Sequence, residues 1–351
     1  MSEENNADRQ PSVPTPPPVY QYPPPPWWVK QPRPSLLRRI GRGVFILLFI
    51  LSVMVNIQLG ILLSGRVSGL DTTVISSGDQ SRQVAVFDLS GTIDQRQADT
   101  FELFYRAVRD TDAIKAVVLR VDSGGGGIAA SDQIHNLVNR IRQTLNKPVV
   151  VSMGSTAASG GYYVSAPANE IFAEPGTITG SIGVIAIWPV VTGLMDKIGV
   201  EMVTIRSTDA GEWKARHFNS FEPADEKVLA DIQAMLDSFQ QRFETVVKEG
   251  RGDRLATGDG VPNGGQAPLN GQVFLADEAL RLGLVDKIGY QSDAVSSAAE
   301  LANLKNPHVV RYSRRLGLGG LLGASEASAL TSLKSLDPFT SPRIMMLWRA
   351  Q

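Results

Sequence analysis

The stretch from Ser155 to Phe172, STAASGGYYVSAPANEIF, surrounds Ser159 with small residues and then runs into two tyrosines. It follows an apolar, β-branched run at 148–152 that predicts a buried strand, and the small residues place Ser159 at the start of a helix. A helix N-terminus favours negative charge that develops during a reaction, so Ser159 is a candidate nucleophile. The same composition also suits a helix that simply packs closely against a sheet. The residues alone leave both interpretations open.

A serine hydroxyl is a weak nucleophile without a base, and this stretch contains no histidine. Of the three histidines in the chain, His135 and His308 have no acidic partner at a telling spacing. His217 lies in the polar segment DAGEWKARHFNS, which also carries Lys214. A serine–lysine pair is a known peptidase arrangement, and it requires a lysine whose pKa is lowered by several units from about 10.4. Lys214 is therefore a second candidate for the base, beside His217.

A glycine-rich turn, RVDSGGGG from Arg120 to Gly127, follows a second predicted strand and precedes a helix expected to begin near Ser131. Backbone N–H groups at such a turn can bind an anion, either a phosphate or the oxyanion of a tetrahedral intermediate. The sequence lacks G-x-x-x-x-G-K-[ST], and GGGG does not match the dinucleotide fingerprint. A tight structural turn and an oxyanion site both remain open.

The elements that must position these residues follow an α/β pattern. Apolar, β-branched runs predict buried strands at 84–89, 116–121 and 148–152. Between the last two strands, apolar residues recur at helical spacing, which predicts a βαβ unit. These apolar residues are Ile134, Leu137, Val138, Ile141 and Leu145.

The later part of the chain predicts a second long helix from Pro223 to Gly250. The segment EMVTIR at 201–206 has a strand-like pattern, and Lys197 is expected at the end of a helix. Residues 256–271 are rich in Gly, Asn and Pro and predict a surface loop, after which ADEALRLGLVDKIGY resumes a helix.

The first 34 residues contain 11 of the 21 prolines. Such runs favour an extended, solvated chain, so we expect a disordered arm. It would serve as a spacer, or as a docking site for a proline-binding partner or for Trp27 and Trp28 at a membrane surface.

Residues 43–65 are apolar and uncharged, and as a helix they are long enough to cross about 30 Å of hydrocarbon. Basic residues precede this run, whereas Arg66 stands alone behind it, so the positive-inside rule predicts a cytoplasmic N-terminus. Everything after about residue 66 then lies outside the cytoplasm. A cleaved signal peptide is the alternative, although the run is longer than a usual h-region.

Composition excludes several classes of function. The chain has 351 residues and 43% hydrophobic content, which is ample for a core, and its net charge of -1 argues against a nucleic-acid binder. The absence of cysteine excludes disulfides, thiolate catalysis and cysteine-based metal sites.

Four separated motifs resemble, in order and spacing, the signal peptide peptidase A (SppA) family of membrane-bound Ser-Lys peptidases. They are VDSGGGGIAASDQIH, VSMGSTAASGGYYVSAPANEIFA, TGSIGVI and LADEALRLGLVDKIG. The resemblance covers about residues 84–300 and implies an α/β fold of the Clp protease/crotonase-like type, built from repeated ββα units. The expected organisation is a proline-rich cytoplasmic arm at 1–42, a transmembrane signal anchor at 43–65, a linker at 66–83, a peptidase domain at 84–300 and a C-terminal extension at 301–351.

The resemblance also implies roles for individual residues. Ser159 would be the nucleophile, Lys214 the general base, and Ser181 the hydroxyl that orients the lysine ammonium. The oxyanion hole would combine the N–H of Gly160 with one from the glycine turn, Gly126 or Gly125. No metal or cofactor is implied. The turn departs from the family's usual N-S-P-G-G, because Asp122 replaces the Asn and Gly124 replaces the Pro.

The function that the resemblance implies is an endopeptidase of the bacterial inner membrane, with its catalytic domain in the periplasm, that degrades cleaved signal peptides and other membrane-released polypeptides. Longer members carry two domain copies, with serine and lysine in different copies, whereas this chain has one. A cyclic homo-oligomer with active sites between protomers is therefore expected. One alternative is a catalytically silent scaffold that binds peptides or partner proteins. Another is a crotonase-type acyl-CoA enzyme in which Ser159 is idle.

Overall fold

The computed structural model describes residues 36–64, 69–256, 261, 268–314 and 343–347, and the chain divides into two compact units between Leu62 and Leu63. Helix α1, Leu36–Ser64, lies in the first unit apart from its last two residues. Its span Ile40–Gln58 has a mean hydropathy of 2.2 and is long and apolar enough to cross a membrane. The predicted apolar helix is confirmed, while most of the proline-rich arm lies outside the described residues.

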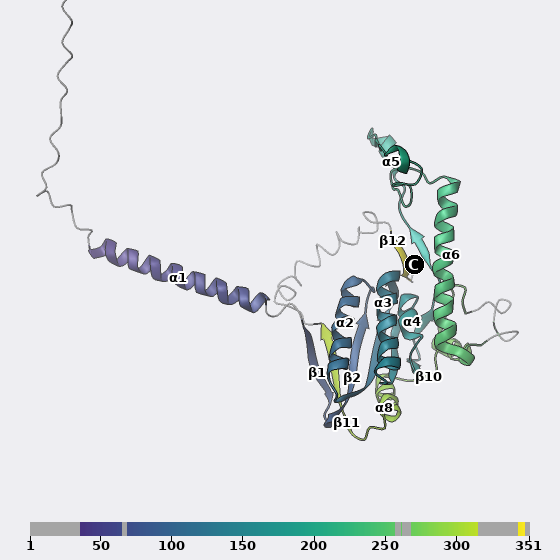
Figure 1. Ribbon diagram of the computed structural model, residues 1–351, viewed down its shortest axis with the longest axis horizontal. Helices are drawn as coiled ribbons and strands as arrows, with labels where there is room; N and C mark the ends of the chain where they lie inside the picture. Colours follow the sequence, from purple (N-terminus) through teal and green to yellow (C-terminus); the bar gives the residue numbers. More distant parts are fainter. Residues whose placement is uncertain (1–35, 65–68, 257–260, 262–267, 315–342, 348–351) are drawn as a thin grey trace, which may run out of the picture. The chain divides into compact units, whose positions relative to one another are not determined.

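One large sheet forms the centre of the second unit (Figure 1). Its main path, in the described residues, runs β1 (Leu70–Ser76), β11 (Pro307–Arg314), β2 (Asp79–Ser90), β3 (Ile114–Ser123), β5 (Val149–Ala158), β6 (Glu170–Ala173) and β10 (Lys287–Ile288). β1 is antiparallel to β11 and the other pairs on this path are parallel. Two further strands continue from the end of β5: β7 (Ile178–Gly180), parallel to β5, and β9 (Val273–Leu275), antiparallel to β7. The three strands predicted from apolar runs are present, and the α/β class is confirmed.

Helices cover both faces of the sheet because successive strand residues point to opposite sides. Ala85, Phe87 and Val117 belong to a core that also contains buried residues of α2 (Gln95–Asp110), α3 (Ile128–Asn139), α4 (Gly160–Ser165) and α6 (Glu226–Arg251). Val84 and Val118 instead belong to a second core with α8 (Gln291–Leu301). The remaining helical elements are a π-helical turn (Arg140–Thr144) after α3, α5 (Thr192–Ile198), α7 (Ala276–Arg281), and the 3₁₀ turns Thr208–Ala210 and Gly252–Arg254.

The structure differs from the sequence-based expectations in three places. Residues 201–206, expected to be strand-like, form no strand, because no neighbouring segment pairs with them among the described residues and Val203 and Ile205 are exposed. The main sheet also extends beyond 84–300, since β1 and the start of β2 lie in the segment expected as a linker and β11 lies in the C-terminal extension. Most of the glycine-rich loop at 256–271 lies outside the described residues.

A second, three-stranded sheet joins distant parts of the chain. It consists of β4 (Gly125–Gly127), β12 (Arg343–Leu347) and β8 (Ile185–Ile187), with β12 in the middle and antiparallel to both neighbours. The glycine turn is therefore an edge strand that pairs with the C-terminal segment.

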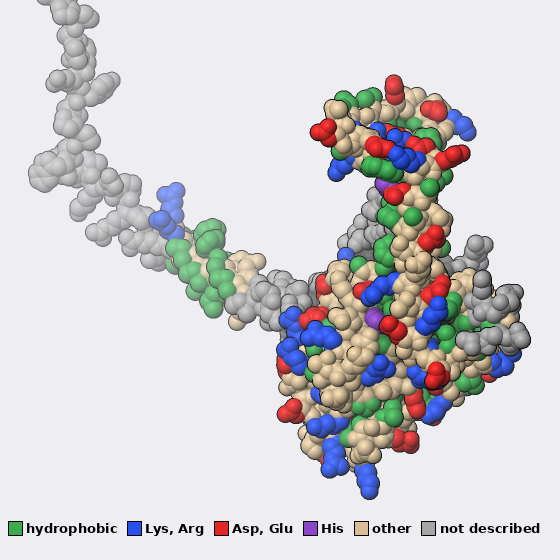
Figure 2. Space-filling view, turned by 45° about the vertical axis from the view of Figure 1, so that its right-hand side comes forward, with side chains coloured by type: hydrophobic (Ala, Val, Ile, Leu, Met, Phe, Trp, Pro, Cys, Tyr) green, Lys and Arg blue, Asp and Glu red, His purple; other side chains and the backbone are tan. Residues whose placement is uncertain are grey.

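Residues 188–225, called the α5 segment below, lie beyond the N-terminal end of α6 and away from the main sheet (Figure 1). Helix α5 has no buried residue. Figure 2 shows hydrophobic side chains on this segment interspersed with charged ones. The exposed apolar side chains include Val190, Leu194, Ile198, Val200, Met202, Val203, Ile205 and Phe221.

Candidate active site

Ser159 occupies the turn between β5 and α4 in a conformation that serine rarely adopts. Its φ is 54° and its ψ is -117°, a backbone strain that persists only where the surroundings impose it and that clusters at functional sites. Here the Ser159 N–H donates to the carbonyl of Gly180 at 2.8 Å, and the Ser159 carbonyl accepts from the N–H of Tyr163 at 2.8 Å. The side chain is buried, and its Oγ has no hydrogen-bond partner among the described residues.

Glycines beside Ser159 allow the glycine turn to approach it. A Cβ on Gly160 would lie 2.7 Å from Ser131 Oγ and 3.1 Å from the backbone nitrogen of Gly126. A Cβ on Gly161 would lie 2.6 Å from the carbonyl oxygen of Ser123. The glycine turn can approach α4 this closely only because Gly160 and Gly161 have no side chains. The S-G-G pattern is therefore required for packing as well as for chemistry.

Two N–H groups of the glycine turn have assigned hydrogen-bond acceptors. The Gly125 N–H donates to Ser123 Oγ at 3.0 Å, and the Gly127 N–H donates to the carbonyl of Ile93 at 2.9 Å. Gly126 lies between them and pairs with Met346 of β12, and its nitrogen is 3.1 Å from the point where a Cβ on Gly160 would stand. Of the two turn glycines predicted for an oxyanion hole, Gly125 already donates its N–H to Ser123 Oγ.

Ser181 lies at the same edge of the sheet as Ser159. β5 and β7 are parallel, and Ala158 pairs with Gly180, so the two serines directly follow paired residues. Ser181 also has a positive φ, 50°, and is buried. The structure therefore brings Ser159, Gly160, Gly126 and Ser181 together.

Lys214 is not part of this cluster within one chain. It lies in the α5 segment, where its N–H donates to the carbonyl of Ala210 and its own carbonyl accepts from Arg206 Nε. Its side chain is exposed, and no hydrogen bond joins it to Ser159 in the described part of the chain. The structure thus places the two members of the predicted dyad on different regions of the protomer.

The histidines have other partners. His217 Nε2 lies 2.6 Å from Asp231 Oδ2, and its ring stacks on Trp213. His135 packs its ring edge-on against Tyr163, and burial lowers its pKa to about 4. A neutral imidazole at that position serves the packing of α3 against α4.

Asp122, which stands where the family's usual turn has Asn, forms hydrogen bonds with β5. Its Oδ1 accepts hydrogen bonds from Ser155 Oγ at 2.7 Å and from the N–H of Thr156 at 3.1 Å. The Asp122 carboxylate is therefore hydrogen-bonded to the segment of β5 that precedes Ser159.

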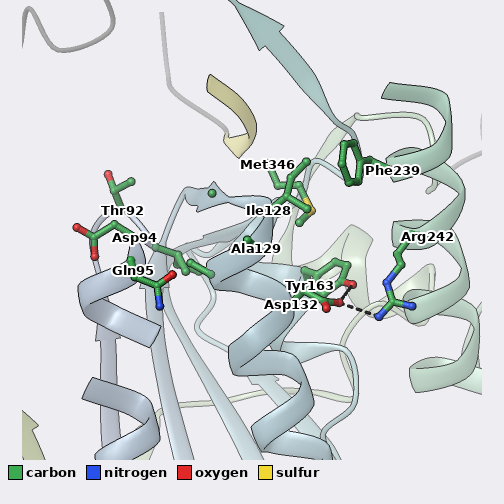
Figure 3. Close-up of a pocket in the computed structure, with 13 residues that line it drawn as sticks. Thr92, Asp94, Gln95, Ile128, Ala129, Asp132, Tyr163, Phe239, Arg242 and Met346 are labelled. Carbon is green, nitrogen blue, oxygen red and sulfur yellow. Dashed lines mark hydrogen bonds and ion pairs between the residues drawn. The ribbon is translucent and has the colours of Figure 1, made fainter. Parts of the chain in front are cut away.

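A cavity of about 630 Å³ adjoins the glycine turn (Figure 3). Its apolar walls include Ile93, Ile128 and Phe239.

At one side of the cavity, Asp132 accepts hydrogen bonds from the Tyr163 hydroxyl at 2.6 Å and from Arg242 at 2.8 Å. Burial alone would raise the pKa of the Asp132 carboxyl, but these two hydrogen bonds outweigh burial and lower it. Burial, followed by the hydrogen bond to Asp132, raises the pKa of the Tyr163 hydroxyl. Tyr163 and Arg242 lie 31 and 110 positions after Asp132 in the sequence. Sequence reasoning missed this group because its members are so far apart in the chain.

Comparison with known proteins matches the model of peptidase family S49 to residues 141–305. "Protease 4" of Haemophilus influenzae is 35% identical over 242 residues, which cover 65% of this chain but only 36% of that protein. A candidate signal peptide peptidase, SppA, of Enterococcus faecium is 29% identical over 78% of this chain and 79% of its own length.

A candidate protease of Synechocystis, slr0021, is 32% identical over 64% of this chain and 76% of its own length. This chain therefore matches little more than a third of the length of Protease 4, but most of the shorter relatives. The shared region contains the strand β5, the turn at Ser159 and the parallel edge formed by β7, and the chain belongs to peptidase family S49.

Proposed function

We propose that the protein is a membrane-anchored serine endopeptidase that uses Ser159 and Lys214. The observation that carries the proposal is Ser159, whose backbone has a strained positive φ and whose buried hydroxyl has no hydrogen-bond partner in the described residues. The next residue, Gly160, lies close to the backbone nitrogen of Gly126. Backbone N–H groups in a closed site are effective donors to a developing oxyanion.

The chemistry follows from this arrangement. Ser159 Oγ attacks the peptide carbonyl carbon while Lys214 Nζ, in its neutral form, accepts the hydroxyl proton. The N–H groups of Gly160 and Gly126 donate to the resulting oxyanion, and the protonated lysine then gives its proton to the leaving amine. Water, deprotonated by the same lysine, hydrolyses the acyl-enzyme. Ser181 accepts a hydrogen bond from the lysine ammonium and orients it.

We infer that Lys214 comes from a neighbouring protomer. Within one chain Lys214 is exposed on the α5 segment and forms no hydrogen bond with Ser159 in the described residues. The same segment exposes a group of large apolar side chains, which on a soluble domain marks an interaction surface. If the same head-to-tail contact joins each protomer to the next and the last to the first, the assembly is a ring. Cyclic symmetry then places the membrane helices of all protomers on the same side of the ring.

The substrates that suit this protein are polypeptides released near a membrane, such as cleaved signal peptides. Support comes from the apolar helix α1, from the basic residues before it, and from the apolar walls of the cavity. The positive-inside rule then assigns a cytoplasmic N-terminus and a periplasmic catalytic domain.

The function is tested on the full chain in detergent. A serine-reactive fluorophosphonate probe should label wild type at Ser159, and the Ser159→Ala variant should lose both labelling and hydrolysis of a fluorogenic peptide. Equal hydrolysis by the two proteins would exclude Ser159 as the nucleophile. Absence of labelling and hydrolysis in wild type would favour the silent scaffold instead.

The dyad between protomers has its own test. Inactive Ser159→Ala and Lys214→Ala proteins are mixed under conditions that allow subunits to exchange. Mixed rings contain interfaces with an intact serine beside an intact lysine, so part of the activity should return. Mixed oligomers that form without any activity would show that the dyad belongs to a single chain.

A further inference from the structure

The turn that carries Lys214 has a strained backbone. The next residue, Ala215, has a φ of 59°, a left-handed conformation that is unfavourable for residues with a Cβ. Both Lys214 and Ala215 are exposed, so burial of their side chains does not impose this conformation. Such strain persists only where surrounding contacts over-determine it, and it clusters at functional sites. The constraint must therefore come from groups that contact the backbone of the turn.

Polar side chains hold the peptide groups on both sides of Ala215. Arg206 Nε donates to the carbonyl of Lys214 at 2.7 Å, and Asn219 Nδ2 donates to the carbonyl of Ala215 at 2.9 Å. The N–H of Lys214 donates to the carbonyl of Ala210 at 2.9 Å. The backbone of Lys214 is thus held at its N–H and at its carbonyl, although its side chain is exposed.

Arg206 is itself fixed by a carboxylate. Its Nη2 donates to Glu222 Oε2 at 2.5 Å, and only 17% of its side chain is exposed. The hydrogen bond from Arg206 is the largest of the effects that lower the pKa of the Glu222 carboxyl, which is therefore ionised at neutral pH. The planar guanidinium donates through two nitrogens in a fixed geometry. It therefore links the Lys214 carbonyl to Glu222, shortly before α6 begins.

We propose that Arg206, anchored by Glu222, is a positioning residue for the general base. It fixes the Lys214–Ala215 peptide, and with it the point from which the lysine side chain extends toward Ser159 of the neighbouring protomer. This inference rests on the proposed function, because it deepens the role of Lys214 in the same site.

The position of the lysine backbone matters for the rate. A general base acts only within hydrogen-bond reach of the proton that it removes. Lysine has a long and flexible side chain, so a mobile backbone would multiply the positions of its ammonium group. A displacement of about 1 Å can cost about 10²-fold in rate. Residues 188–225, all of which the structure describes, include no strand, and α5 has no buried residue. The Arg206–Glu222 pair therefore supplies an order that packing does not.

Arg216 offers a matched control on the same segment. It follows Lys214 closely in the sequence and, like Arg206, donates through Nη2 to a carboxylate, that of Asp225. Removal of either arginine deletes one positive charge near the lysine. In the described residues, however, only the Arg206 side chain donates to the backbone of Lys214.

The first experiment separates kcat from KM in the full chain in detergent. Arg206→Met should lower kcat for a fluorogenic peptide by about 10²-fold and leave KM within about twofold of wild type, because the base is displaced while substrate contacts remain. Arg216→Met should stay within about threefold of wild type in both constants. Equal kcat for the two variants, or a rise in KM without a loss of kcat, would overturn the inference.

The second experiment acts on the anchor, so it does not depend on the folding of Arg206→Met. Glu222→Ala should lower kcat by about tenfold or more, because Arg206 loses its carboxylate partner. Glu222→Gln keeps an oxygen that accepts a hydrogen bond from Arg206, and it should regain most of the lost activity. Equal kcat in the two Glu222 variants would contradict the anchoring role.

The third experiment measures the base without peptide hydrolysis. Attack of Ser159 on a fluorophosphonate probe also requires removal of its proton, so Arg206→Met should slow labelling about as much as it lowers kcat, and Arg216→Met should not. In a Ser159→Ala background, Arg206→Met should leave the affinity for a fluorescein-labelled peptide unchanged by fluorescence polarisation. Weaker binding at a wild-type labelling rate would assign Arg206 to substrate binding and overturn its positioning role.

Lys214→Ala separates this inference from the proposed function. If Lys214→Ala is inactive but Arg206→Met matches Arg216→Met, the positioning role fails and the proposed function stands. If Lys214→Ala keeps wild-type activity, the proposed dyad is itself wrong, whatever the arginine variants show.

Discussion

The Ser159 region and the α5 segment are built in opposite ways. Ser159 is buried between strands β5 and β7 and helix α4, and hydrogen bonds hold its backbone from both sides. Lys214 lies in a segment without regular strands, where helix α5 has no buried residue and many apolar side chains face solvent.

The difference separates a preorganised half-site from an unfinished one. The packed sheet around Ser159 stabilises the protein enough to offset the backbone strain at this residue. The geometry of the Ser159 region is therefore fixed within one protomer. The exposed α5 segment cannot hold a lysine in a dry pocket alone, and a lysine needs desolvation or a neighbouring cation to act as a base. A contact with a second copy would supply both burial for the apolar side chains and an environment for the lysine.

The largest effect expected from this comparison is the loss of catalysis without loss of fold. Lys214→Ala and Lys214→Arg should each lower kcat by about 10⁴-fold or more, because arginine is not deprotonated in proteins and alanine has no base. The melting temperature should not change, since the Lys214 side chain is exposed.

His217→Ala is the control for a base on the same segment, and it should retain much of the activity. A severe loss in His217→Ala with mild losses in both lysine variants would replace the serine–lysine mechanism by a serine–histidine one. Steady-state kinetics with a fluorogenic peptide measure all three.

A smaller effect is expected when one methyl group is added to each region. Gly126→Ala would place a Cβ 2.1 Å from the carbonyl oxygen of Ile93, so the backbone must shift and the free energy of unfolding should fall by about 2 kcal/mol or more. Gly193→Ala adds the same group to helix α5, where nothing lies within 4 Å.

Because alanine favours a helix over glycine, Gly193→Ala should stabilise the protein by up to about 1 kcal/mol or leave it unchanged. Urea unfolding followed by circular dichroism measures both variants. Comparable losses would mean that the α5 segment is packed as tightly as the Ser159 region.

The free energy of unfolding should depend on pH because the His135 side chain is buried. His135 has a pKa of about 4 in the folded protein, chiefly because of burial, against 6.5 for an exposed histidine. Between these values the unfolded chain binds a proton that the folded protein does not, so the free energy of unfolding falls as pH falls from 6.5 to 4.

The loss from His135 amounts to about 3 kcal/mol at most and levels off below pH 4. His135→Gln should flatten this part of the curve, measured by urea unfolding at a series of pH values. An unchanged slope in the variant would assign the pH dependence to other groups, such as Asp132.

The smallest expected effect is on the free energy of unfolding when a buried hydroxyl is removed. It should distinguish a hydroxyl that donates a hydrogen bond within the protein from one that has no partner. Thr179 Oγ1 donates to the carbonyl of Ala157 at 2.6 Å, so Thr179→Val should lower the free energy of unfolding by about 1 kcal/mol or more. Ser131 is equally buried, but its Oγ has no partner in the described residues. Ser131→Ala should therefore stay within about 0.5 kcal/mol of wild type. An equally large loss at Ser131 would indicate an ordered water or another partner that completes its hydrogen bonds.

Local patterns in the sequence determined the framework of the site. The apolar runs at 84–89, 116–121 and 148–152 specify buried strands because strands covered on both faces need apolar side chains at successive positions. The periodic residues from Ile134 to Leu145 specify the helix between them, and the glycines around Ser159 and Gly126 mark where backbones must approach. The order of these motifs also sufficed to identify the peptidase family.

Only the tertiary structure decided which distant residues meet. Ser159, with its positive φ, donates its N–H to the carbonyl of Gly180, which lies 21 positions later in the chain. The Asp132–Tyr163–Arg242 group forms because α3, α4 and α6 share one face of the sheet. The apolar residues at 344–347 could have been recognised as part of a strand, but nothing local specifies its partners. Main-chain pairing is the same for every residue type, so the choice of β4 and β8 as neighbours of β12 depends on long-range packing and on the cavity that receives Met346.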